Sequence, residues 1–75
     1  MKNPEAVKLL KNCYTEGVYL IPVSTGCELI RLYIKELKEI DVGDINEPTD
    51  MFTLQLYNIA IDRVFTYYLT EETYE

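Results

Sequence analysis

Residues 50–69 read "DMFTLQLYNIAIDRVFTYYL", and the fold depends on whether this stretch is a helix or a strand. At about 100° per residue, one apolar stripe continues through it without a break. Thr49 or Asp50 can cap the first turn. The pattern therefore predicts a helix over residues 50–69, within an all-α fold that we expect to be a small three-helix bundle. The stripe consists of Leu54, Tyr57, Ile61, Val64, Phe65 and Tyr68.

A second apolar group lies well round the same predicted helix. A helix that is apolar over so much of its circumference must bury more than one side. Two helices of the same chain can cover the first stripe, which leaves the second group for a dimer or for another protein. This second group consists of Phe52, Leu56, Ile59 and Tyr67, with Arg63 in its midst.

An alternative interpretation makes residues 52–57 a strand. Their sequence, "FTLQLY", alternates apolar and polar residues with period two, as half-buried strands do. The segment could then pair with residues 18–23, "VYLIPV", to give an α+β fold. Pro22 argues against a central strand, so residues 18–23 are either an extended connector or a short edge strand. The unbroken stripe favours the helix.

Residues 4–16 are predicted to form the first helix. Asn3 can cap it, and Pro4 suits the first helical position because its missing N–H has no helical partner there. Apolar residues then recur at intervals of three and four. Gly17 is expected to end the helix, as glycine often does one position past a helical C-terminus.

Residues 26–40 are predicted to form the second helix. Thr25 at the cap and Glu28 three residues later match a capping box. One broad apolar face follows, opposite a charged face, which makes this the most clearly amphipathic segment of the chain.

Length and composition predict a single domain over residues 1–75, with residues 70–75 as a frayed acidic tail. Apolar residues make up 48% of the chain, too many for a disordered protein. No apolar run approaches the roughly 18 residues of a membrane span, and no signal-peptide segment stands at the start. We expect a cytoplasmic protein, with Cys13 and Cys27 reduced and packed in the core.

The acidity is concentrated in the second half. Residues 1–38 hold six basic and four acidic residues, a net charge of +2. Residues 39–75 hold nine acids and one arginine, a net charge of −8. This distribution disfavours nucleic acid and anionic membranes as direct partners and favours a basic protein surface.

Catalytic and metal chemistry find little support. Without histidine there is no Ser–His or Cys–His pair, and three scattered glycines make no phosphate-binding loop. The loop 41–50 supplies carboxylates, but no frame places acids, glycine and a final glutamate as an EF-hand requires. We expect no enzyme, no cofactor and no specific metal site.

Seven tyrosines are more than a core of this size needs. Tyr14, Tyr33, Tyr57 and Tyr68 fall on predicted core faces. Tyr19, Tyr67 and Tyr74 do not, and tyrosine suits interfaces because it offers a large contact area at little rotamer cost.

Two functions follow as hypotheses. The first is a non-enzymatic acidic regulator or inhibitor that binds a basic, nucleic-acid-binding surface of a partner protein. Isoleucine and tyrosine are plentiful while alanine, arginine and glycine are scarce, as in low-GC bacteria and their phages, and small acidic inhibitors are a class of protein that phages encode. The second is a self-associating helical module that dimerises through Phe52, Leu56 and Ile59 of the third helix. The partner-binding residues expected for the first are Asp41, Asp44, Glu47, Asp50, Arg63, Tyr67, Glu71, Glu72, Tyr74 and Glu75.

Overall fold

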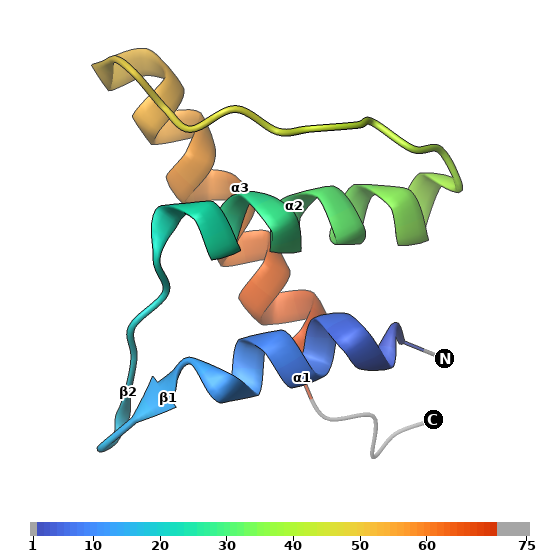
Figure 1. The fold of residues 1–75 in the computed structure, drawn as a ribbon, viewed down its shortest axis with the longest axis vertical. Coiled ribbons are helices and arrows are strands. Elements are labelled where there is room, and N and C mark those ends of the chain that lie inside the picture. Colours follow the sequence, from blue (N-terminus) through green and yellow to red (C-terminus); the bar gives the residue numbers. More distant parts are fainter. Residues whose placement is uncertain (1, 71–75) are drawn as a thin grey trace.

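The computed structural model describes residues 2–70 of the chain (Figure 1). Within them, three helices and a two-stranded sheet follow one another in the order α1, β1, β2, α2 and α3, which confirms the predicted three-helix fold. None of the helices in this part of the chain is long and apolar enough to span a bilayer. The elements are α1 (Pro4–Asn12), β1 (Tyr14–Thr15), β2 (Val18–Tyr19), α2 (Val23–Lys38) and α3 (Met51–Leu69).

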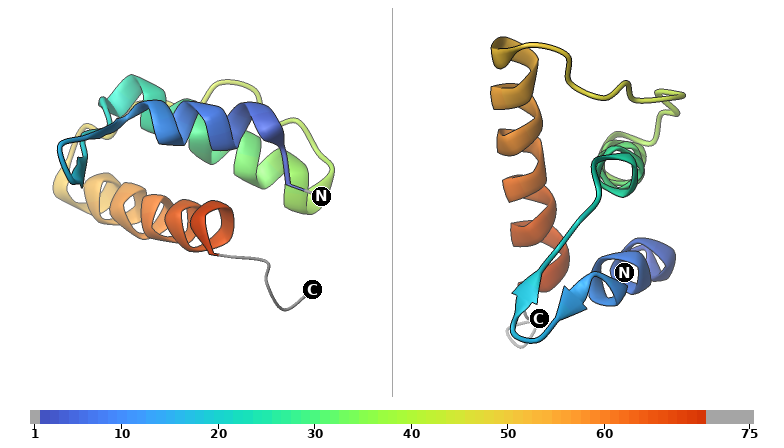
Figure 2. Two further views of the ribbon diagram at one scale, coloured as in Figure 1. Left: turned by 90° about the horizontal axis from the view of Figure 1, so that it is seen from below. Right: turned by 60° about the vertical axis from the view of Figure 1, so that its left-hand side comes forward.

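The helices form two layers. α1 and α2 lie side by side and run in opposite directions, and α3 crosses them on one side (Figures 1 and 2). Apolar side chains from all three helices fill the space between the layers, so each helix helps to bury apolar side chains of the other two. The buried cluster consists of Ala6 and Leu10 of α1, Leu29, Ile30 and Leu32 of α2, and Val64 and Tyr68 of α3.

The first helix begins as predicted but ends early. The Asn3 side chain accepts hydrogen bonds from the backbone N–H groups of Glu5 (2.8 Å) and Ala6 (3.4 Å), and Pro4 occupies the first helical position. The helix stops at Asn12, so the prediction that residues 4–16 are helical is wrong for its last turn.

A β-hairpin replaces that last turn. Tyr14 pairs with Tyr19 and Thr15 with Val18, in antiparallel register. Glu16 (φ 50°) and Gly17 (φ 88°) both have positive φ, as a two-residue type I′ turn requires. Gly17 therefore turns a hairpin instead of ending a helix. Tyr14, expected in the core, is 54% exposed, and its ring lies 4.9 Å from that of Tyr19.

The alternative interpretation of the sequence is correct for one strand. Val18–Tyr19 is extended and paired, but its partner is β1. Residues 52–57 lie inside α3 and are helical. The stripe of 3.6-residue period therefore outweighs the short alternation in "FTLQLY".

The second helix begins at Val23, earlier than predicted. Pro22 occupies the cap position, and no side chain makes a capping hydrogen bond. Thr25 lies within the first turn, so the predicted Thr25–Glu28 capping box is wrong. The helix ends at Lys38 because Glu39 adopts a left-handed conformation (φ 58°, ψ 31°), a common way for a helix to terminate.

The third helix has the predicted limits. Asp50 Oδ1 accepts from the Thr53 backbone N–H (2.8 Å), and Thr53 Oγ1 accepts from the Asp50 N–H (3.1 Å), a reciprocal capping box. The helix ends at Leu69.

α3 crosses α2 at a glycine. A Cβ added to the buried Gly26 would overlap the Tyr57 hydroxyl oxygen and lie 2.9 Å from Tyr57 Cζ. The missing side chain therefore lets the ring of Tyr57 rest against the backbone of α2. Beyond this crossing, the first half of α3 extends away from the other two helices (Figure 1).

Candidate functional site

Residues 39–50, here called the acidic connector, join α2 to α3 without helix or strand. The connector runs back along α2 before it reaches the start of α3 (Figure 1). It contains no basic residue, and all its acids are exposed. These acids are Glu39, Asp41, Asp44, Glu47 and Asp50.

Two of the connector acids have roles within the chain. Asp41 accepts a hydrogen bond from the Gly43 N–H (2.9 Å) and lies 3.7 Å from the Arg31 guanidinium. The Gly43 hydrogen bond, assisted by the charges of Lys35 and Arg31, lowers the pKa of Asp41. Hydrogen bonds from Thr53 lower the pKa of Asp50, the cap of α3. Asp41 and Asp50, both predicted to bind a partner, therefore also stabilise the local structure of this chain.

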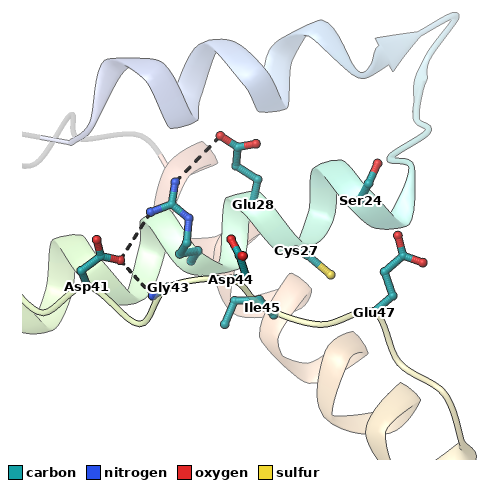
Figure 3. A pocket seen from close by; sticks show the side chains of 9 residues that line it. Ser24, Cys27, Glu28, Asp41, Gly43, Asp44, Ile45 and Glu47 are labelled. Atoms are coloured by element: carbon teal, nitrogen blue, oxygen red, sulfur yellow. Dashed lines mark hydrogen bonds and ion pairs between the residues drawn. The ribbon is translucent and has the colours of Figure 1, made fainter.

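Asp44 and Glu47 differ from these two acids. Neither makes a hydrogen bond or ion pair with any residue of the described range 2–70. Both line an open recess of about 450 Å³ between α2 and the connector (Figure 3). Arg31 also lines the recess, but Glu28 (4.0 Å) and Asp41 already neutralise it.

The Cys27 thiol lies at the same recess. It is buried and donates to the Asn46 carbonyl at 3.7 Å. Burial, and secondly the charge of Glu47, raise the pKa of Cys27, which keeps the thiol protonated and unreactive. Both cysteines are free, but Cys13 is only half-buried and lies outside the buried cluster, so the expectation that it packs in the core is wrong for this residue.

The outer face of α3 is open. Phe52, Leu56 and Ile59 are 69%, 50% and 56% exposed, although they are large and apolar. We call these three residues the open stripe. Arg63 is exposed on the same face.

Tyr67, predicted to extend the second apolar group, packs inside the molecule instead. It is half-buried, and its ring lies edge-on to those of Tyr33 (5.6 Å) and Tyr68 (4.9 Å). Tyr19 is also half-buried, with its ring 5.1 Å from that of Phe65. Two tyrosines expected at an interface therefore serve the packing of this chain.

A polar junction joins the three helices at Glu36. Its carboxylate accepts hydrogen bonds from the Asn3 N–H (3.1 Å), the Tyr67 hydroxyl (3.1 Å) and the Tyr68 hydroxyl (2.8 Å). The donors come from the start of α1 and the end of α3, so one side chain of α2 holds both. Sequence reasoning missed Glu36. The available signal was its place four residues after Leu32 and seven after Leu29, on the buried face of α2.

The phenol of Tyr68 is expected to make stability fall at alkaline pH. Burial, and then the hydrogen bond to Glu36, raise its pKa above the unfolded value of about 10. The unfolded chain therefore loses this proton first, and stability that is fully present below pH ~10 declines above it. We expect Tyr68→Phe to reduce the slope of unfolding free energy by up to about 1.4 kcal/mol per pH unit between pH ~10 and ~11.

Urea titrations at several pH values measure this slope. Tyr14→Phe, which removes an exposed phenol, provides the control and should leave the slope unchanged. Equal slopes for the wild type and Tyr68→Phe would contradict the assignment.

The predicted residues Glu71, Glu72, Tyr74 and Glu75 lie outside the described residues. Among residues 2–70, no group of three or more acidic or cysteine side chains is placed to hold a metal ion. The described residues therefore present two surfaces that could bind a partner: an acidic recess and an exposed apolar face of α3.

Comparison of the chain with protein-family models, curated proteins and solved structures finds no match.

Proposed function

We propose that this protein is a non-enzymatic regulator that binds a basic surface of a partner protein through the acidic connector. One observation carries the proposal: Asp44 and Glu47 are exposed at the rim of a recess and have no partner among the described residues. A pair of carboxylates with no ion-pair partner within residues 2–70 is available to an external cation.

The recess suits the side chain of a lysine or arginine. Its volume of about 450 Å³ exceeds what one such side chain needs, and carboxylates from both α2 and the connector line it. Since Glu28 and Asp41 neutralise Arg31, that guanidinium does not oppose the entry of a second cation. Charge-assisted hydrogen bonds from a partner's basic group would then satisfy Asp44 and Glu47.

A nucleic-acid-binding surface is the partner class that this charge pattern fits best. Such surfaces are built from lysine and arginine side chains spaced to meet phosphates. The acids of the connector lie two or three residues apart along a segment without helix or strand, and we propose that they take the positions of successive phosphates. A protein that occupies such a surface excludes nucleic acid from it, and we therefore propose that the regulation is inhibitory. We also propose that the protein acts in the cytoplasm and is an inhibitor of the kind that phages encode.

Capture from a cell lysate at two salt concentrations tests the proposal. We expect a basic partner to be retained at about 50 mM salt, released at about 500 mM, and displaced by added DNA or heparin. The double variant Asp44→Asn, Glu47→Gln should bind roughly tenfold more weakly, which corresponds to about 1.4 kcal/mol.

The matched control is Glu5→Gln, Glu16→Gln. These two acids are exposed and lie outside the connector, and the double variant loses the same charge. Two results would show that the connector is not the binding surface. One is retention of the partner that does not change with salt or with added DNA or heparin; the other is equal weakening of partner binding by both double variants.

A further inference from the structure

The acidic connector also borders a second cavity, on the side of α3. The connector spans the angle between α2 and the first half of α3 (Figure 1), and a groove of about 680 Å³ is lined by all three segments. This volume falls within the range of about 300–1,000 Å³ that is usual for small-molecule sites. The apolar lining consists of Ile30 of α2, Ile45 and Pro48 of the connector, and Leu56, Tyr57 and Ala60 of α3.

Glu47 is the only charged residue among the described residues that line this groove. Its carboxylate is exposed and makes no ion pair with any residue of the range 2–70. The groove therefore combines an apolar surface with a single negative charge. Glu47 also lines the recess beside α2, whereas Asp44 lines the recess and not the groove.

The walls of the groove are held in place by contacts within the chain. The Tyr57 ring rests against the backbone of α2, because Gly26 has no side chain to displace it. Ile30 is only 5% exposed, so it lies at the bottom of the groove. The connector is tied to α2 by the hydrogen bond from the Cys27 thiol to the Asn46 carbonyl (3.7 Å). Binding in the groove therefore needs little rearrangement of the protein, which favours affinity.

We propose that this groove binds a small organic cation, a compact molecule with an apolar or aromatic body and one ammonium group. The body displaces water from the apolar walls, and the ammonium group donates charge-assisted hydrogen bonds to the Glu47 carboxylate. Walls from three segments suit a compact molecule better than an extended chain, which has to enter and leave the groove. The proposal does not depend on the binding of a partner protein, because it concerns the purified protein and a small molecule.

Titration of the purified protein with phenethylamine, followed through the amide NMR resonances, tests the proposal. We expect saturable shifts confined to residues 45–49 and 53–60, with a dissociation constant on the order of 1 mM for a probe of this size. Phenethyl alcohol, the neutral analogue, should bind about five- to tenfold more weakly, and the hydrocinnamate anion more weakly still. Equal binding of the amine and the alcohol, or no saturable shift up to about 20 mM amine, overturns the proposal.

Glu47→Gln separates the charge of the groove from its shape. Because Glu47 is exposed and unpaired within residues 2–70, we expect the variant to fold as the wild type does. The amine should lose its five- to tenfold advantage, roughly, and bind as the alcohol does, while the affinity for the alcohol stays unchanged.

Asp44→Asn is the matched control, because it removes the same charge from a connector residue that does not line the groove. At about 150 mM salt, where screening limits effects at long range, it should leave the affinity for both probes unchanged. Equal weakening of amine binding by Glu47→Gln and Asp44→Asn overturns the proposal.

Two further results would assign the cation to another place or another source. Shifts centred on Ser24 and Glu28 would place the amine in the recess beside α2. Binding of an acetylated lysyl-phenylalanine amide more than about tenfold tighter than that of phenethylamine would show that the groove receives side chains of a protein. Either result overturns the proposal of a small-molecule site.

Discussion

Replacing Glu36 with leucine is expected to bring the domain to the edge of unfolding. The change removes the acceptor of three donors at once: the Asn3 N–H and the hydroxyls of Tyr67 and Tyr68. A buried donor left without a partner costs about 1–3 kcal/mol, and Tyr68 is only 5% exposed. The combined loss of roughly 3–6 kcal/mol compares with a total stability of about 4–11 kcal/mol for a domain of this length.

Urea denaturation at neutral pH measures this loss. Glu36→Gln keeps one carbonyl acceptor and removes the charge, so we expect it to lose less stability than Glu36→Leu. Adding Tyr67→Phe and Tyr68→Phe to Glu36→Leu removes two of the stranded donors and should recover part of the stability. A Glu36→Leu variant as stable as the wild type would show that the hydrogen bonds at Glu36 contribute nothing to the free energy of unfolding.

Replacing Gly26 with valine is expected to cost about 1–3 kcal/mol, the usual range for an overfilled contact. The new side chain overlaps the Tyr57 hydroxyl, and Tyr57 Cζ lies within 2.9 Å of the added Cβ. Either the ring leaves its place or the two helices separate. Thermal unfolding measures the effect.

A double-mutant cycle isolates the clash. Tyr57→Leu removes the overlapping atoms and leaves Ile61 Cδ1, the movable end of a side chain, 3.2 Å from the added Cβ. Gly26→Ala should then stabilise the domain, because alanine favours a helix over glycine by about 1 kcal/mol. In the wild-type background the clash should cancel or reverse that gain. If Gly26→Ala has the same effect in both backgrounds, Tyr57 does not hold the crossing.

Local signals in the sequence determined the third helix and the connector. The Asp50 cap, the unbroken stripe from Leu54 to Tyr68 and the end at Leu69 all depend on neighbours within one or two turns. The exposed acids between α2 and α3 followed from composition in the same way. The open stripe could also be predicted, since an apolar group outside the core face is a property of one helix.

Only the tertiary structure shows which side chains are buried or hydrogen-bonded by residues far away in the sequence. Tyr67 and Phe52 share one apolar group in the sequence, yet Tyr67 packs inside, where its ring contacts Tyr33 and its hydroxyl donates a hydrogen bond to Glu36, 31 residues away. The Asn3 N–H and the Tyr68 hydroxyl reach the same carboxylate across 33 and 32 residues. No periodicity within a single helix records such contacts, because they arise only when the helices cross. For the same reason the sequence alone did not separate the packed end of α3 from its open face.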